Sequence, residues 1–217
     1  MTRIWLIPVL FVTVIILAGI SYGTDTGYRF PQTVSQYEDE GGDTEWANIN
    51  DVKAQDGVFA FNDLRGGSKS YILQATNYGF TIPTTATIDG IEVIMLRKDA
   101  LDRDAILDIS ARLLRNNNPV GDNYRNLDYW GSDPPPSPPF IPGRNTIQYG
   151  SSSDKWGTTW TPAQINDASF GFEIYVNSET ESGKAEIDYI KIKVYYTEAA
   201  GVSTSCVMQT NKFCGPI

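Results

Sequence analysis

Alternation of apolar and polar side chains over residues 187–196 is the feature that most limits the fold of this chain. Ile192 and Val194 share one face of an extended strand, whereas Lys191 and Lys193 share the other. Such a strand buries one face and exposes the other, so the chain needs a sheet with a core on one side. The same period of two recurs in three further segments, residues 71–75, 91–95 and 170–176.

Residues 105–115 fit two patterns. Leu107, Ile109 and Leu113 alternate as in a strand, yet Ile106, Ile109 and Leu113 also satisfy a helical spacing. We interpret the segment as a strand, because the neighbouring segments are short, strand-like and separated by clusters of Gly, Pro, Asn and Asp. Several such strands without alternating helices predict an all-β fold, an antiparallel β-sandwich of jelly-roll type.

The first residues have the form of an export signal. Arg3 precedes an apolar stretch from residue 4 to residue 20, and Ser21 and Gly23 supply the small residues of a cleavage site after Gly23. The stretch is also long enough for a membrane anchor through residues 4–22. Both alternatives place the remaining chain outside the cytoplasm, so we expect an extracellular or cell-surface protein.

A length of 217 residues leaves room for a single domain after the signal. We divide the chain into a signal or anchor (residues 1–23), a polar lead-in (24–45), a β-sandwich domain (46–197) and a tail (198–217). The lead-in is acidic and glycine-rich, with one expected strand near residues 32–37. A proline-rich run at residues 134–139 predicts a stiff loop within the long connection between residues 116 and 145.

Composition excludes several functional classes. The net charge is −9 without a basic cluster, so nucleic acid is not an expected partner. The chain has no His, which removes the usual general base, the Ser-His pair and the commonest zinc ligand. Catalysis would depend on carboxylates, Lys or Tyr. We therefore expect a protein that is not an enzyme.

An ordered series of short motifs runs through the sandwich domain. Its residues are Trp46, Asn48, Asp56, Gly57 and Ala60, residues 77–83 and 86–93, residues 149–161 with 165–167, Phe170, Gly171, and residues 187–189. The series resembles a largely uncharacterised β-sandwich family of phage or prophage structural, tail-associated proteins and predicted bacterial surface proteins, over about residues 46–197. The resemblance implies a structural or surface-binding role and brings no catalytic residues, while the proline-rich run and the tail depart from the family pattern.

Trp156 and Trp160 lie between Asp154 and Asp167 in a pattern typical of sugar-binding surfaces, in which aromatic rings stand beside carboxylates. The alternative, which we favour, is that both rings plug one end of the sandwich and both carboxylates cap turns. Paired carboxylates for a glycoside hydrolase have as candidates Glu173, Glu179, Glu181 and Glu186, which we place on solvent faces or at a hairpin tip.

The long connection carries Tyr124, Tyr129, Trp130 and Phe140, which are our candidate binding residues because loops on a rigid scaffold often carry function. The alternative is that Trp130 and Phe140 fold back and hold the connection against the sandwich. We expect a surface glycan or protein partner, or self-association. A carbohydrate-binding module is the alternative function, and a carboxylate-dependent hydrolase is a further one.

Cys206 and Cys214 are the only cysteines, and an oxidising compartment favours a disulfide between them. We expect no cofactor and no metal site. Calcium stays open as an alternative, because oxygen ligands are available, but no loop has the D-x-D-x-D-G pattern. The oxygen ligands in question are Asp39, Glu40, Asp43 and Asp56.

Overall fold

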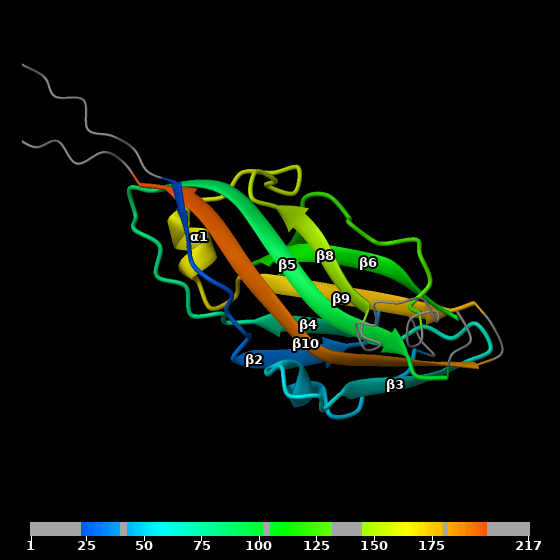
Figure 1. Ribbon diagram of the computed structural model, residues 1–217. Coiled ribbons are helices and arrows are strands. Elements are labelled where there is room, and N and C mark those ends of the chain that lie inside the picture. Colours follow the sequence, from blue (N-terminus) through cyan, green and yellow to red (C-terminus); the bar gives the residue numbers. More distant parts are fainter. Residues whose placement is uncertain (1–22, 40–42, 102–104, 132–144, 180–181, 199–217) are drawn as a thin grey trace, which may run out of the picture.

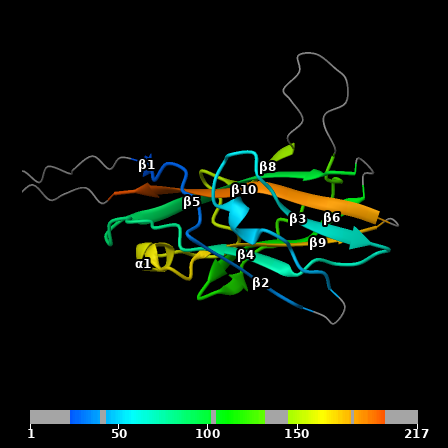
Figure 2. The same cartoon turned by 90° about the horizontal axis from the view of Figure 1, so that it is seen from below.

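The computed structural model describes residues 23–39, 43–101, 105–131, 145–179 and 182–198. These residues form two antiparallel sheets packed face to face (Figure 1), and Figure 2 shows the two layers from the side. The all-β sandwich predicted from the alternation is therefore confirmed. The expected disulfide, the proline-rich run, Glu40, Phe140, Glu181 and the apolar stretch of residues 4–20 lie outside the described residues.

We call the two layers sheet A and sheet B. Sheet A consists of β1 (Gly23–Asp25), β3 (Ala60–Arg65), β5 (Thr87–Asp99), β8 (Asn145–Ser151) and β10 (Ser182–Thr197). Sheet B consists of β2 (Thr33–Tyr37), β4 (Ile72–Thr76), β6 (Ile106–Arg115), β7 (Asn118–Val120) and β9 (Gly171–Ser178). In sheet A the order is β1, β10, β5, β8, and β3 pairs with the other half of β10. In sheet B the order is β2, β4, β9, β6, β7.

Two short helical turns accompany the strands. The 3-10 turn η1 (Ile49–Val52) lies between β2 and β3, and α1 (Pro162–Asn166) lies between β8 and β9. Thr161 caps α1 by accepting a hydrogen bond from the backbone of Gln164, whose side chain in turn bonds the backbone of Thr161. In the described ranges no helix is long and apolar enough to cross a membrane.

The core lies between the sheets and follows the predicted faces. Ile192 and Val194 of β10 and Ile174 and Val176 of β9 are completely buried. The register predicted for residues 187–196 is therefore confirmed. Residues 105–115 are confirmed as strand β6, and the strand expected near residues 32–37 is β2.

One prediction about β9 was wrong. Alternation placed Glu173 and Tyr175 on a solvent face, but they are only 3% and 4% exposed. The lead-in provides the cover: Tyr37 of β2 donates a hydrogen bond to Glu173, and Tyr175 donates one to Asp43. Strand β1 pairs with β10 in sheet A, and strand β2 pairs with β4 in sheet B. The sandwich therefore begins before residue 46.

Candidate functional site

The N-terminal segment of residues 23–30 lies along β10. Strand β1 pairs with the end of β10, with Gly23 opposite Thr197. Further along, the backbone of Arg29 donates to Ile192 at 2.8 Å and accepts from Ile192 at 3.0 Å. Because successive side chains of an extended segment point to opposite sides, Tyr28 lies on the outer face of sheet A and Arg29 lies beside a pocket. The segment therefore contributes to two candidate sites.

On the outer face, three aromatic rings and two ammonium groups alternate, and we call them the tyrosine–lysine row. The Lys191 Nζ lies 4.7 Å from the ring centroid of Tyr189 and 4.8 Å from that of Tyr28. The Lys193 Nζ lies 4.4 Å from the ring centroid of Tyr28 and 4.8 Å from that of Tyr195. Each cation thus lies within cation–π distance of two rings, and the Tyr28 ring is shared between them.

Glu92 of β5 fixes two of these rings. It is opposite Lys193 in the register, and its carboxylate accepts hydrogen bonds from the hydroxyls of Tyr28 and Tyr195, the latter at 2.9 Å. Glu92 is only 7% exposed, so both phenol groups are held by a carboxylate that has little contact with solvent. A carboxylate on a central strand of sheet A therefore orients one ring from β10 and one ring from the N-terminal segment.

The surroundings of the row raise the pKa of Tyr28 and shift the pKa values of the two lysines in opposite directions. Burial, and then the hydrogen bond to Glu92, raise the pKa of Tyr28 to about 12. A hydrogen bond with Tyr195 raises the pKa of Lys193, whereas burial lowers the pKa of Lys191. Hydrogen-bonding and nearby negative charge stabilise the charged form of Lys193, while partial loss of water disfavours that of Lys191. The row presents cations between neutral phenol rings.

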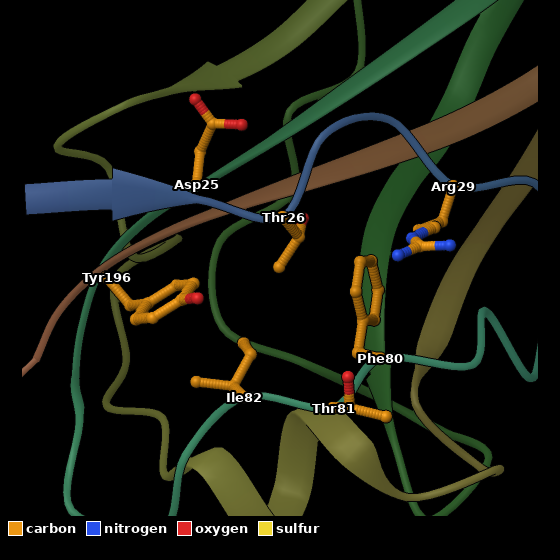
Figure 3. Close-up of a pocket in the computed structure, with 7 residues that line it drawn as sticks. All are labelled: Asp25, Thr26, Arg29, Phe80, Thr81, Ile82 and Tyr196. Carbon is orange, nitrogen blue, oxygen red and sulfur yellow. The ribbon is translucent and has the colours of Figure 1, made fainter.

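The second candidate is a pocket of about 180 Å³ at the edge of the sandwich (Figure 3). Its apolar lining comes from Phe80, Ile82 and Tyr196, and its charged lining from Asp25 and Arg29. In Figure 3 the Asp25 carboxylate points away from Phe80 and Ile82. Pockets that enclose organic ligands usually measure about 300–1,000 Å³. This pocket fits only a small group, and it contains a single carboxylate, so it lacks the acid–base pair of a glycoside hydrolase.

A buried polar cluster joins the sheets beneath the long connection, and we call it the Asp108 network. The Oδ1 of Asp108 accepts hydrogen bonds from Arg97 Nη1 at 2.5 Å and from Trp130 Nε1 at 2.7 Å. Its Oδ2 accepts bonds from the Tyr149 hydroxyl at 2.7 Å and from the backbone of Asn126 at 2.9 Å. Arg97 and Tyr149 belong to sheet A and Asp108 belongs to sheet B. The cluster therefore fixes the two layers and the connection together.

The structure separates the candidate binding residues of the connection. Trp130 is fully buried in the Asp108 network, so it is not available for contact with a partner, as its alternative role predicts. Tyr124 is half-buried, and its ring packs edge-on against Trp156 at 4.6 Å. Tyr129 is 45% exposed and donates a hydrogen bond to Glu179 at 2.9 Å. Tyr129 is the most exposed of the three.

Trp156 and Trp160 are 0% and 7% exposed and belong to the core. The Trp156 Nε1 donates to the backbone oxygen of Ile91 at 2.9 Å. Asp154 accepts the backbone N–H of Trp156, and Asp167 accepts that of Ser169, so both carboxylates stabilise turns. These tryptophans therefore do not form an exposed sugar platform.

The candidate acids lie on separate elements. Glu173 is buried on sheet B, and burial raises its pKa. Glu186 lies on sheet A between Lys98 and Lys184, and Glu179 is exposed. Across the described part of the chain, no group of three or more acidic, His or Cys side chains is arranged to hold a metal ion. Asp56, one of the calcium candidates, accepts the backbone N–H of Val58 in a local turn.

Sequence reasoning missed the tyrosine–lysine row. The alternation of β10 places Tyr189, Lys191, Lys193 and Tyr195 on one face, which is the part that could have been found. Tyr28 reaches this face only because β1 pairs with the end of β10. No local pattern in the sequence reports that contact.

Comparison of the chain with protein-family models, with curated proteins and with solved structures finds no match.

Proposed function

We propose that this chain is a non-enzymatic, exported β-sandwich protein that acts as a surface, appendage or virion-type structural or binding component. The observation that carries the proposal is the tyrosine–lysine row: aromatic and cationic side chains of β10, together with Tyr28 of the N-terminal segment, with two of the rings held by Glu92 of β5. A rigid site that presents such groups without an acid–base pair suits recognition better than turnover.

The order of the strands supports a jelly roll as the finer description of the fold. Without β1 and β2, the orders β3, β10, β5, β8 and β4, β9, β6, β7 are those of two interlocked Greek keys. Jelly rolls occur in virion and lectin domains, which agrees with the resemblance to phage and surface proteins. Fold alone does not assign a function, so this observation supports the proposal and does not carry it.

Export fits the way in which the sandwich begins. Cleavage after Gly23 leaves Thr24 and Asp25, which pair with Tyr196 and Tyr195, at the new N-terminus. The mature chain thus keeps most of β1 and the whole segment that carries Tyr28. N-terminal sequencing of protein secreted from a host tests this step: a sequence that begins at Thr24 supports export, and an intact protein in the cytoplasm overturns it.

The alternative function is a carbohydrate-binding module. It is favoured by the tyrosine rings of the row, because aromatic faces beside hydrogen-bonding groups suit sugar rings. A glycan array separates the two functions. Selective retention of some sugars supports the module, and self-association in light scattering without selective retention supports a structural subunit. A chain that neither binds nor assembles, or that hydrolyses the arrayed glycans, overturns the proposal.

A further inference from the structure

The outer face of sheet A carries two pairs of lysines, which differ in whether a protein carboxylate forms an ion pair with them. Lys98 and Lys184 lie 4.4 Å from the ring centroids of Phe59 and Phe61, and both form ion pairs with Glu186, at 3.1 and 3.2 Å. Each of these two ammonium groups is therefore in a direct ion pair, and they share one carboxylate. This pair lies toward the start of β10, at the opposite end from β1.

Within the described residues, no carboxylate forms an ion pair with Lys191 or Lys193. Lys191 donates one hydrogen bond, to Gln55 Oε1 at 3.3 Å, although an ammonium group has three donors. The nearest fixed acid, Glu92, has both of its oxygens engaged by tyrosine hydroxyls. Among the described residues, the two ammonium groups thus contact phenol groups and an amide but form no ion pair with a carboxylate, so an external anion can supply one.

We infer that the tyrosine–lysine row binds an acidic polysaccharide, with Lys191 and Lys193 contacting its anionic groups and the half-buried rings of Tyr28 and Tyr195 packing against its sugar rings. The third ring, that of Tyr189, is only 3% exposed and contacts Lys191 without facing a ligand. The inference rests on the proposed function and names the class of ligand for that site. The two lysines are two residues apart on one strand, so their stems are separated by about 7 Å. Anionic groups carried on successive parts of one polymer can reach both.

Charge density favours a polysaccharide over a nucleic acid. The protein is acidic as a whole, so its long-range field repels a polyanion with a charge about every 1.7 Å. A polymer with sparser anionic groups loses less to this repulsion and gains contact with the rings. The same repulsion acts against an anionic membrane surface. Nucleic acid and anionic vesicles are therefore alternative outcomes of the test.

The decisive experiment compares two double variants that remove equal charge from the same face. Lys191→Gln with Lys193→Gln alters the row, and Lys98→Gln with Lys184→Gln alters the pair that shares an ion pair with Glu186. Exported full-length protein is titrated calorimetrically with alginate, which carries carboxylates, chondroitin sulfate, which also carries sulfates, and neutral dextran. We expect affinity for an acidic polymer to fall about tenfold or more in the row variant and less than about twofold in the control.

Three further measurements serve as controls. Thermal melts of both double variants check that each is folded, and Lys193→Arg should retain binding because it keeps the cation. Raising the ionic strength from about 0.05 to about 0.5 M should weaken binding of the wild-type protein more than that of the row variant.

The outcomes separate this inference from the proposed function. Equal losses in the two double variants, or tighter binding of duplex DNA or anionic vesicles than of either acidic polymer, overturn the inference. Binding of dextran through the row overturns the anionic ligand but leaves the proposed function standing. Absence of any glycan binding together with absence of self-association overturns both.

Discussion

The Asp108 network and the tyrosine–lysine row use the same kinds of side chain for different ends. Both contain cations near aromatic rings and a carboxylate that accepts bonds from tyrosine. In the network, Arg97 is 3% exposed and lies 5.0 Å from the Trp130 ring, with Asp108 directly bonded to it. In the row, Lys191 and Lys193 are half-buried, and Glu92 is hydrogen-bonded to the tyrosine hydroxyls and not to the cations.

The difference shows how position on the sandwich decides the role of a charge. Between the sheets, an unpaired charge would cost several kcal/mol, so the carboxylate must be bonded to the guanidinium. On the outer face, water shares the solvation of an ammonium group, so the carboxylate is free to orient the rings. A closed cluster stabilises the fold, whereas an open one keeps donors for a ligand.

The largest effect is expected at Ile192, which lies between the two lysines of the row in sequence but faces the core. Ile192→Asp places an unpaired carboxylate at a fully buried position and should unfold the domain. Lys191→Ala should change the midpoint of thermal unfolding little, because Lys191 is half-exposed. The reverse ranking in thermal melts would contradict the observed register of β10.

Asp108→Ala should lower the free energy of unfolding by about 3–5 kcal/mol, because it leaves the Arg97 guanidinium buried without its partner. The same change frees the donors of Trp130 and Tyr149. Urea unfolding measures the loss. The exposed Asp128, in the same connection, provides the control Asp128→Ala, which should cost less than about 0.5 kcal/mol. Similar losses in the two variants would show that the Asp108 network does not stabilise the packing of the two sheets and the connection.

Tyr28→Phe removes only the hydroxyl that bonds Glu92 and should destabilise the protein by about 1–2 kcal/mol. Tyr129→Phe removes a phenol–carboxylate bond of the same kind to Glu179, but at an exposed position, so we expect about 0.5 kcal/mol or less. Hydrogen exchange should show faster opening of residues 23–30 in Tyr28→Phe alone. Equal losses would mean that the row adds nothing to the docking of this segment.

Alkaline pH should weaken the fold in a defined range. The pKa of Tyr28 is raised to about 12, above the ordinary value of about 10, so the folded state retains the phenol proton longer than the unfolded chain does. This contribution is complete below pH about 10 and is lost as the pH rises toward about 12. Melts between pH about 9 and 11.5 measure it, and Tyr28→Phe should reduce the slope. Three other tyrosines with pKa values near 12 keep part of the slope: Tyr37, Tyr124 and Tyr175.

The smallest effect is expected from reduction of the predicted disulfide between Cys206 and Cys214, which both lie beyond the last strand of the sandwich. Reducing agent should leave the melting midpoint of the core almost unchanged. Mass mapping of the two cysteine peptides under non-reducing conditions tests the bond. Covalent dimers, or two free thiols in exported protein, would contradict the intrachain pairing.

The fold was largely predictable because apolar and polar residues alternate along a strand, and this local pattern indicates which side chains face the core. The inward faces of β9 and β10 and the strand at residues 106–115 follow from a period of two. Helix α1 was missed, although Thr161 and Gln164 form a capping box that marks a helix start. The burial of Glu173 was also missed, since its cover comes from Tyr37, which is distant in sequence.

The candidate site was much less predictable. The row requires Tyr28 to meet Lys193, and that contact depends on the pairing of the two ends of the described chain. Trp130 was named as a candidate binding residue, and the structure instead agrees with the alternative that it folds back against the sandwich. Its partner Asp108 lies on β6, 22 residues earlier in the chain. Sequence periodicity reports which way a side chain points. It does not report which distant side chain it meets.

The pairing of Gly23 with Thr197 also sets where the two ends of the described chain lie. Both ends of the described chain leave the sandwich beside the start of β5 (Figure 1), whereas Gly131 lies beside Asp99 at the far end of that strand. Thirteen residues of β5 span about 40 Å between these points. The first and last described residues therefore lie at the same end of the sandwich. The length of β5 separates that end from the one that carries Tyr129, and the tyrosine–lysine row lies on the outer face of sheet A between them.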